Sequence, residues 1–160
     1  MNPVKELNNL WHIVSMQIKT EMCSGKYPTI HGISLVELSI LEIVKQYPNS
    51  MMKEISEILE LPKSTLTSAV KRLELKKFIK KNPCIKDKRG YNLVLTELGL
   101  KAQQEHRDIE IIVFRNLLHQ LDKDEIETFI RIFSKAVNKS KKWNIKKDKW
   151  IEKSTITYPL

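Results

Sequence analysis

Leu61-Pro62 separates two short amphipathic segments that have almost no linker between them. Apolar residues recur at helical spacing on both sides of this break: Met52, Ile55, Ile58 and Leu59 before it, and Leu66, Ala69, Val70 and Leu73 after it. Because proline cannot continue a helix, the pattern predicts two helices joined by a tight turn. Ser50 is expected to cap the first helix, and the second is expected to run from Lys63 to about Phe78. This order is typical of a helix-turn-helix.

The apolar period changes from helical to strand-like after Phe78. Two short runs, residues 79–85 and 91–96, flank the charged segment Lys86-Asp87-Lys88-Arg89-Gly90. This pattern predicts a β-hairpin with a charged tip. A hairpin directly after the second helix of a helix-turn-helix would form a wing.

Further amphipathic helices are expected on either side of this region. An apolar stripe marks the first of them: Leu7, Leu10, Trp11, Val14, Ile18 and Met22. Ser34 and Glu37 form the capping box of a second helix, in which Leu38, Leu41 and Val44 are expected to face inward. Thr96 can cap a third, long helix, and Asp122 with Glu125 opens a fourth. The predicted fold class is therefore mainly α with a small β-hairpin wing.

The basic side chains of the chain are concentrated in two segments. The formal net charge is +9, from 28 Lys and Arg against 19 Asp and Glu. Residues 51–96 hold eleven basic and five acidic side chains, and residues 138–160 hold seven and two. Clustered positive charge favours a polyanionic partner such as nucleic acid.

Several other chemistries lack their sequence signatures. Gly25, Gly32, Gly90 and Gly99 are the only glycines, and their spacing forms no phosphate-binding loop. Cys23 and Cys84 are neither a disulfide framework nor a C-x-x-C motif. The histidines form no metal-binding pair: they are His12, His31, His106 and His119. Without a nucleophile motif, a bilayer-length apolar run or a signal peptide, we expect a cytoplasmic protein that is not an enzyme and uses no metal or cofactor.

Three motifs carry a resemblance to a known family. They are Gly32-Ile33-Ser34 before the second helix, L-P-K-S-T-L-T-S-A-V-K-R-L-E along the basic helix, and D-K-R-G-Y-N-L-V-L-T-E-L-G after the wing tip. Through them the chain resembles the MarR family of winged helix-turn-helix transcriptional regulators over most of residues 4–137. The resemblance implies that the basic helix enters the DNA major groove, that the wing arginine reaches the minor groove, and that the outer helices form a two-fold dimer.

The resemblance also implies a division of the chain into three regions. Residues 34–96 would be the winged helix-turn-helix DNA-binding region, residues 1–33 and 97–137 the helical dimerisation region, and residues 138–160 a basic C-terminal tail. Lys77 stands where the family commonly has a glycine, so we expect a left-handed backbone there or a shifted helix end. Lys71 stands where an acidic residue is common, which adds charge to the DNA-facing side.

The candidate DNA-binding residues of the basic helix are Lys63, Ser64, Thr65, Thr67, Ser68, Lys71 and Arg72. Short hydroxyl side chains let a helix approach base edges and phosphates closely, while the basic groups supply charge or a guanine contact. Lys88 and Arg89 suit the negative potential of a narrow minor groove, and Asp87 is expected to orient an arginine. Lys80 and Lys81 are expected to contact phosphates. The alternative for every one of these positions is an ordinary solvated surface.

The expected function is sequence-specific binding of a pseudo-palindromic double-stranded operator by a homodimer. We expect a repressor that a small-molecule effector or a redox signal releases, with Cys23 either an oxidation sensor or an inert thiol. The alternative is a non-sequence-specific nucleic-acid-binding or architectural protein, which the charge alone permits. The tail, with Trp143 and Trp150 among its lysines, suits contact with DNA, an extended dimer helix, a membrane surface or single-stranded nucleic acid. A disordered tail is the equal alternative.

Overall fold

The computed structural model describes residues 2–83 and 91–138. Cys84, the three wing-tip candidates Asp87, Lys88 and Arg89, and the basic tail lie outside these ranges. The elements are α1 (Pro3–Met22), η1 (Pro28–Ile30), α2 (Leu35–Gln46), β1 (Ser50–Met51), α3 (Met52–Leu59), α4 (Lys63–Leu75), β2 (Ile79–Pro83), β3 (Tyr91–Leu95), α5 (Glu97–Leu118) and α6 (Lys123–Asn138). This order of helices with a small sheet confirms the expected fold class.

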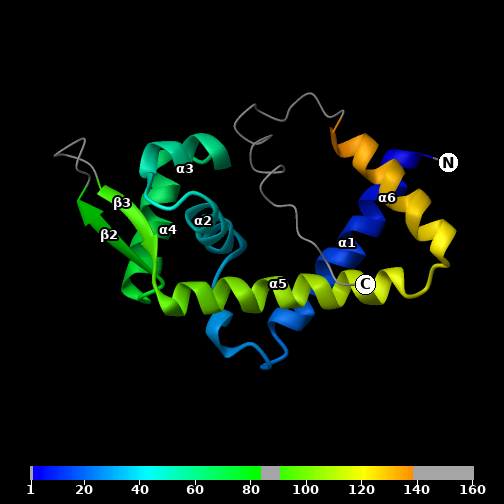
Figure 1. The fold of residues 1–160 in the computed structure, drawn as a ribbon, viewed down its shortest axis with the longest axis horizontal. Helices are drawn as coiled ribbons and strands as arrows, with labels where there is room; N and C mark the ends of the chain where they lie inside the picture. The colour runs from blue at the N-terminus through cyan, green and yellow to red at the C-terminus, as the bar shows by residue number, and fades with distance from the viewer. Residues whose placement is uncertain (1, 84–90, 139–160) are drawn as a thin grey trace.

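Helix α5 runs along the length of the molecule and joins its two ends (Figure 1). The helices α2, α3 and α4 and the sheet lie around its first half, whereas α1 and α6 lie toward its second half. Both α1 and α2 contact α5. The winged helix-turn-helix and the outer helices therefore occupy opposite ends of the chain's longest helix.

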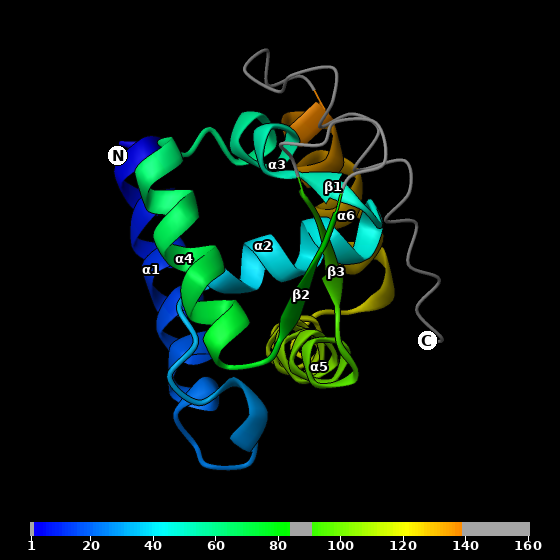
Figure 2. The same ribbon diagram turned by 90° about the vertical axis from the view of Figure 1, so that its left-hand side faces the viewer.

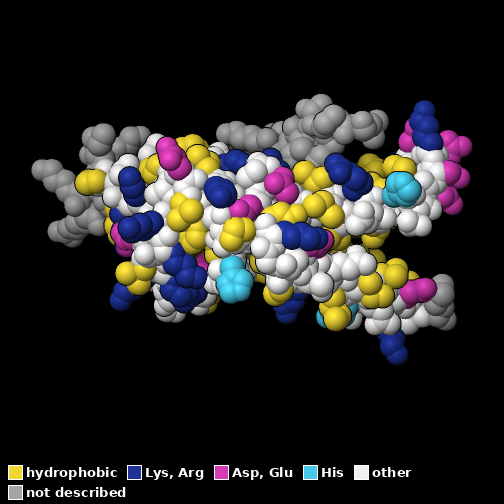
Figure 3. Space-filling view, turned by 90° about the horizontal axis from the view of Figure 1, so that it is seen from below, with side chains coloured by type: hydrophobic (Ala, Val, Ile, Leu, Met, Phe, Trp, Pro, Cys, Tyr) yellow, Lys and Arg dark blue, Asp and Glu magenta, His cyan; other side chains and the backbone are white. Residues whose placement is uncertain are grey.

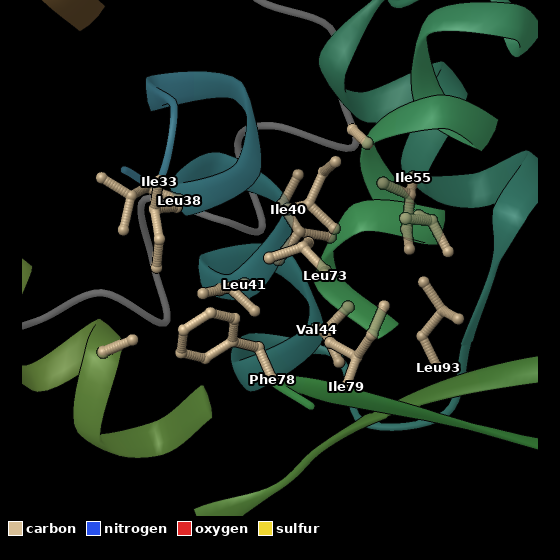
Figure 4. Close-up of a cluster of buried hydrophobic side chains, with 14 of the residues drawn as sticks. Ile33, Leu38, Ile40, Leu41, Val44, Ile55, Leu73, Phe78, Ile79 and Leu93 are labelled. Carbon is tan, nitrogen blue, oxygen red and sulfur yellow. The ribbon is translucent and has the colours of Figure 1, made fainter. Parts of the chain in front are cut away.

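The hydrophobic core lies between α2, α4 and the sheet (Figure 4). The apolar side chains predicted to face inward from α2 and α4 are all buried: Leu38, Leu41, Val44, Leu66, Ala69, Val70 and Leu73. Ile79 and Leu93 enclose this core from the two strands of the hairpin, at 1% and 0% exposure. The helical period of the sequence therefore identified the buried face of both helices.

The expected capping box of α2 is present. The Ser34 hydroxyl accepts a hydrogen bond from the Glu37 N–H at 3.2 Å, and the Glu37 carboxylate accepts one from the Ser34 N–H at 2.8 Å. Helix α2 ends at Gln46, before Pro48. The Thr96 cap of α5 and the Asp122–Glu125 pair that opens α6 are also confirmed.

The prediction that Ser50 caps α3 is wrong. Ser50 belongs to β1, where it pairs antiparallel with Leu93 of β3, and its hydroxyl donates to the Tyr47 carbonyl. The N–H of Met51 donates instead to the Glu54 carboxylate at 2.9 Å. The free edge of β3 can accept a short extended segment, so the backbone around Ser50 is used for strand pairing rather than for a helix cap. The expected hairpin therefore becomes a three-stranded sheet in the order β1-β3-β2.

Candidate nucleic-acid interface

Helix α4, the recognition helix of the helix-turn-helix, lies beside α2 (Figure 2). The residues on its exposed face are mostly polar. Four apolar side chains hold its inner face in the core, as described above. All seven of its predicted DNA-binding residues are exposed: Lys63, Ser64, Thr65, Thr67, Ser68, Lys71 and Arg72. The Thr67 hydroxyl donates to the Lys63 carbonyl at 2.7 Å, so only its acceptor lone pairs are available to a ligand.

The exposed Arg72 side chain is hydrogen-bonded to a buried carboxylate. Its Nε donates to Glu37 Oε1 at 2.9 Å, and the Glu37 side chain is only 3% exposed whereas the Arg72 side chain is 53% exposed. Burial by itself would raise the pKa of Glu37, but the hydrogen bonds from Ser34 and the Arg72 guanidinium outweigh it and hold that pKa below its usual value. Glu37 is therefore an ionised carboxylate at neutral pH.

Lys76 makes a second hydrogen bond between the end of the recognition helix and the residues before α2. Its Nζ donates to the Gly32 carbonyl at 2.7 Å. Lys76 directly follows α4, so Arg72 and Lys76 together attach the end of this helix to residues 32–37 at the start of α2. The η1 turn just before these residues is attached to α5, because the Glu105 carboxylate accepts hydrogen bonds from the Thr29 hydroxyl and N–H at 2.6 and 3.0 Å.

The base of the wing carries a basic groove. A groove of about 400 Å³ lies between the end of α4 and β2, with Lys77, Lys80 and Lys81 in its lining. The Lys81 ammonium pairs with the Glu74 carboxylate at 2.5 Å and lies 4.9 Å from the centre of the Tyr91 ring. Lys80, the residue before Lys81 in β2, is exposed. The two lysines, predicted as equivalent phosphate contacts, therefore have different surroundings.

A tight junction joins the end of the recognition helix to α5. Lys77 has φ +62°, which confirms the left-handed backbone expected where the family commonly has glycine. The Thr96 hydroxyl donates to the Lys77 carbonyl at 2.7 Å, and the Thr96 N–H donates to the Phe78 carbonyl at 3.0 Å. The Gly99 N–H donates to the Thr96 hydroxyl at 3.1 Å. The L-T-x-x-G motif thus connects the recognition helix, the wing and α5.

Basic side chains gather at the end of the molecule that carries α4 and β2, at the left of Figure 3. No local pattern in the sequence marks Glu37 and Glu74 as the partners of Arg72 and Lys81. Glu37 had a local signal only for its capping role, and Glu74 had none.

Within the described ranges, no cluster of His, Cys, Asp or Glu could hold a metal ion. Over the same residues, no helix is both long enough and apolar enough to cross a membrane.

Known proteins share parts of this sequence and this fold. Residues 33–91 match the model of the MarR family, whereas a search of curated protein sequences found no match. Streptococcus pneumoniae FabT in complex with DNA aligns with a TM-score of 0.72 and 18% identity over 86% of this chain and 96% of that chain. The YusO protein from Bacillus subtilis aligns with a TM-score of 0.69 and 23% identity over 86% and 96%. A mutant MarR from E. coli complexed with operator DNA aligns with a TM-score of 0.61 and 22% identity over 84% and 96%.

The solved structures establish a shared fold over nearly their whole length. The family match adds the sequence signature of the DNA-binding part, because residues 33–91 extend from the segment before α2 to the start of β3. Over residues 33–91, the chain carries the sequence signature of the MarR family of winged helix-turn-helix transcriptional regulators.

Proposed function

We propose that this chain binds double-stranded DNA in a sequence-specific manner, with α4 in the major groove. The observation that carries the proposal is the division of α4 into a fully buried apolar face and an exposed face of hydroxyl and basic side chains. The residues proposed to contact DNA are Lys63, Ser64, Thr65, Thr67, Ser68, Lys71 and Arg72. Hydroxyls allow a close approach to base edges, and lysines neutralise phosphates.

The wing is proposed to supply the second set of contacts. Strands β2 and β3 carry it directly beside the end of α4, so a duplex that receives α4 lies within reach of the hairpin. Lys88 and Arg89, which lie outside the described residues, are the proposed minor-groove contacts, and Asp87 is the proposed orienting residue. The proposed DNA-binding region is residues 34–96.

A homodimer is proposed to form through residues 1–33 and 97–137. None of the residues of α1 and α6 is buried within the chain. Large apolar side chains are exposed on both helices: Val4, Leu7, Leu10, Trp11, Ile13 and Met16 on α1, and Phe129, Ile130, Ile132 and Phe133 on α6. Apolar surface of this extent is usually covered in a soluble assembly, and a two-fold pair matches a pseudo-palindromic operator.

The proposed regulatory mode is repression from an operator that overlaps a promoter, with release by a small molecule or an oxidant. Cys23 is exposed at the end of α1, so an oxidant can reach its thiol. Because the target is DNA, the proposed site of action is the cytoplasm. The basic tail, residues 138–160, is proposed to add non-specific attraction to DNA through its lysines.

Selection from random-sequence duplexes tests the DNA-binding proposal. The full chain is expected to enrich a pseudo-palindromic sequence and to hold it against excess unselected duplex. Arg89→Ala and Lys71→Ala are expected to weaken binding of the enriched duplex without changing the melting temperature. If no sequence is enriched, or if unselected duplex competes equally, the chain is a non-specific nucleic-acid-binding protein instead.

A further inference from the structure

The carboxylate of Glu37 connects two structural elements, and each of its oxygens has a different task. Oε2 accepts hydrogen bonds from the Ser34 N–H and hydroxyl, at 2.8 and 2.7 Å, and so closes the first turn of α2. Oε1 accepts the hydrogen bond from Arg72 Nε. Glu37 therefore links the start of α2 to the second half of the recognition helix.

The link is built from a buried charge and an exposed one. A carboxylate that is 3% exposed needs a partner, because a buried charge without one is strongly destabilising. The Arg72 guanidinium supplies a charge-assisted hydrogen bond, which has a narrow range of distance and angle. The position of Arg72 relative to α2 is therefore restricted by geometry as well as by packing.

Apolar contacts alone allow a helix more rotation and sliding than the hydrogen bond between Arg72 and Glu37 does. Leu66 and Leu73 hold α4 against the core, but hydrophobic attraction is non-directional and tolerates small rotations and shifts. The hydrogen bond of Arg72, in the last turn of α4, and that of Lys76, the residue that follows the helix, both end on the segment from Gly32 to Glu37. Together these two hydrogen bonds oppose rotation of α4 about its axis. Such a rotation would move Ser64 and Ser68 away from the groove of a bound duplex.

We propose, on the basis of the DNA-binding function above, that Glu37 is a positioning residue for sequence recognition. It sets the orientation of α4 through Arg72 without touching DNA itself. Arg72 then acts on specificity through helix position rather than by reading a base. A chain in which this pair is broken keeps its attraction to DNA, which depends on charge, and loses preference among sequences, which depends on geometry.

A double-mutant cycle on the selected duplex tests this proposal. Glu37→Ala and Arg72→Ala are each expected to weaken binding of the enriched duplex by about tenfold, while binding of unselected duplex changes less than about threefold. The double variant is expected to bind no more weakly than either single variant. Repeating the selection with Glu37→Ala is expected to give a weaker or altered sequence preference.

Ser34→Ala is the matched control, because it removes the hydroxyl cap of α2 and leaves the Arg72 pair in place. It is expected to lower the melting temperature without changing the ratio of selected to unselected binding. Glu37→Gln replaces Glu37→Ala if the latter fails to fold, since an amide oxygen can still accept the Ser34 hydrogen bonds. If the Glu37 variants acted only through loss of the helix cap, the Ser34 and Glu37 variants would change the ratio of selected to unselected binding alike.

Two results would overturn the inference. One is a Glu37 variant that keeps full preference for the selected duplex while Arg72→Ala loses it, because Arg72 then reads DNA directly. The other is strict additivity of the two single variants. If the wild-type chain enriches no sequence at all, the proposed function fails first, so the two failures are distinguishable.

Discussion

The carbonyl oxygen of Phe78 lies 2.1 Å from the point that a Cβ atom on Gly99 would occupy. Phe78 follows the recognition helix, and Gly99 lies in the first turn of α5, so two backbone segments meet here without an intervening side chain. The same carbonyl accepts the Thr96 N–H. The end of α4 is therefore held directly against α5, the helix that leads to the other end of the molecule.

Gly99→Ala is expected to lower the free energy of unfolding by about 1–3 kcal/mol, because the added methyl group forces the two backbones apart. Chemical denaturation measures this change. Lys101→Ala, at an exposed position of the same helix, serves as the control and is expected to change stability by less than about 0.5 kcal/mol. Equal stability of Gly99→Ala and the wild type would show that α5 does not approach Phe78 closely.

Lys77→Gly is expected to stabilise the protein by about 0.5–1 kcal/mol. A side chain in the left-handed region costs roughly 1–2 kcal/mol, and the greater chain entropy that glycine loses on folding offsets part of the gain. Lys71→Gly, in the exposed middle of α4, is expected to destabilise by about 1 kcal/mol. Melting curves of the two variants should therefore shift in opposite directions, and a shift in the same direction would contradict the backbone assignment.

The Glu37 carboxylate is expected to stabilise the protein only above acidic pH. Its pKa in the folded protein is lowered, so its stabilising contribution is complete above the unfolded pKa of about 4.3 and is lost as the pH falls through the folded pKa. The difference in unfolding free energy between the wild type and Glu37→Gln should be largest near neutral pH and shrink below about pH 4. A difference that grows on acidification would contradict an ionised Glu37.

Lys80→Ala and Lys81→Ala are expected to have separable effects. Loss of the exposed Lys80 should weaken all duplexes alike and reduce the salt dependence of binding by roughly one unit, with no change in stability. Loss of Lys81 removes its pair with Glu74 and its contact with the Tyr91 ring, which should also lower the unfolding free energy by up to about 1 kcal/mol. Salt titrations and denaturation of both variants distinguish a phosphate contact from a wing support.

The wild-type chain is expected to sediment as a dimer of the 18.8 kDa protomer at micromolar concentration. Phe133→Asp, on the exposed face of α6, should weaken the dimer because it places a charge in the apolar contact. Leu75→Asp is the control, since Leu75 is 72% exposed at the end of α4, far from the proposed interface. A stable monomer of the wild-type chain would contradict the proposed dimerisation region.

Local signals in the sequence were sufficient for most of the helices and for the outer face of α4. The Ser34–Glu37 capping box, the Thr96 cap and the break at Pro62 each depend on residues within a few positions, and the buried face of α4 follows from a period of 3.6. These features could be predicted because backbone geometry alone places the interacting groups together. The wing-tip residues were predicted from the same kind of signal and remain predictions.

Contacts between distant residues were decided only by the tertiary structure. Ser50 looked like a helix cap until the edge of β3, at Leu93, was brought beside it. Arg72 looked like a free DNA-binding side chain, although its partner Glu37 lies 35 positions earlier in the chain. The sequence by itself determined which faces are apolar and which are charged. The packing of the core determined which charged groups meet across it, because a periodic pattern specifies the orientation of a side chain but not the element that it faces.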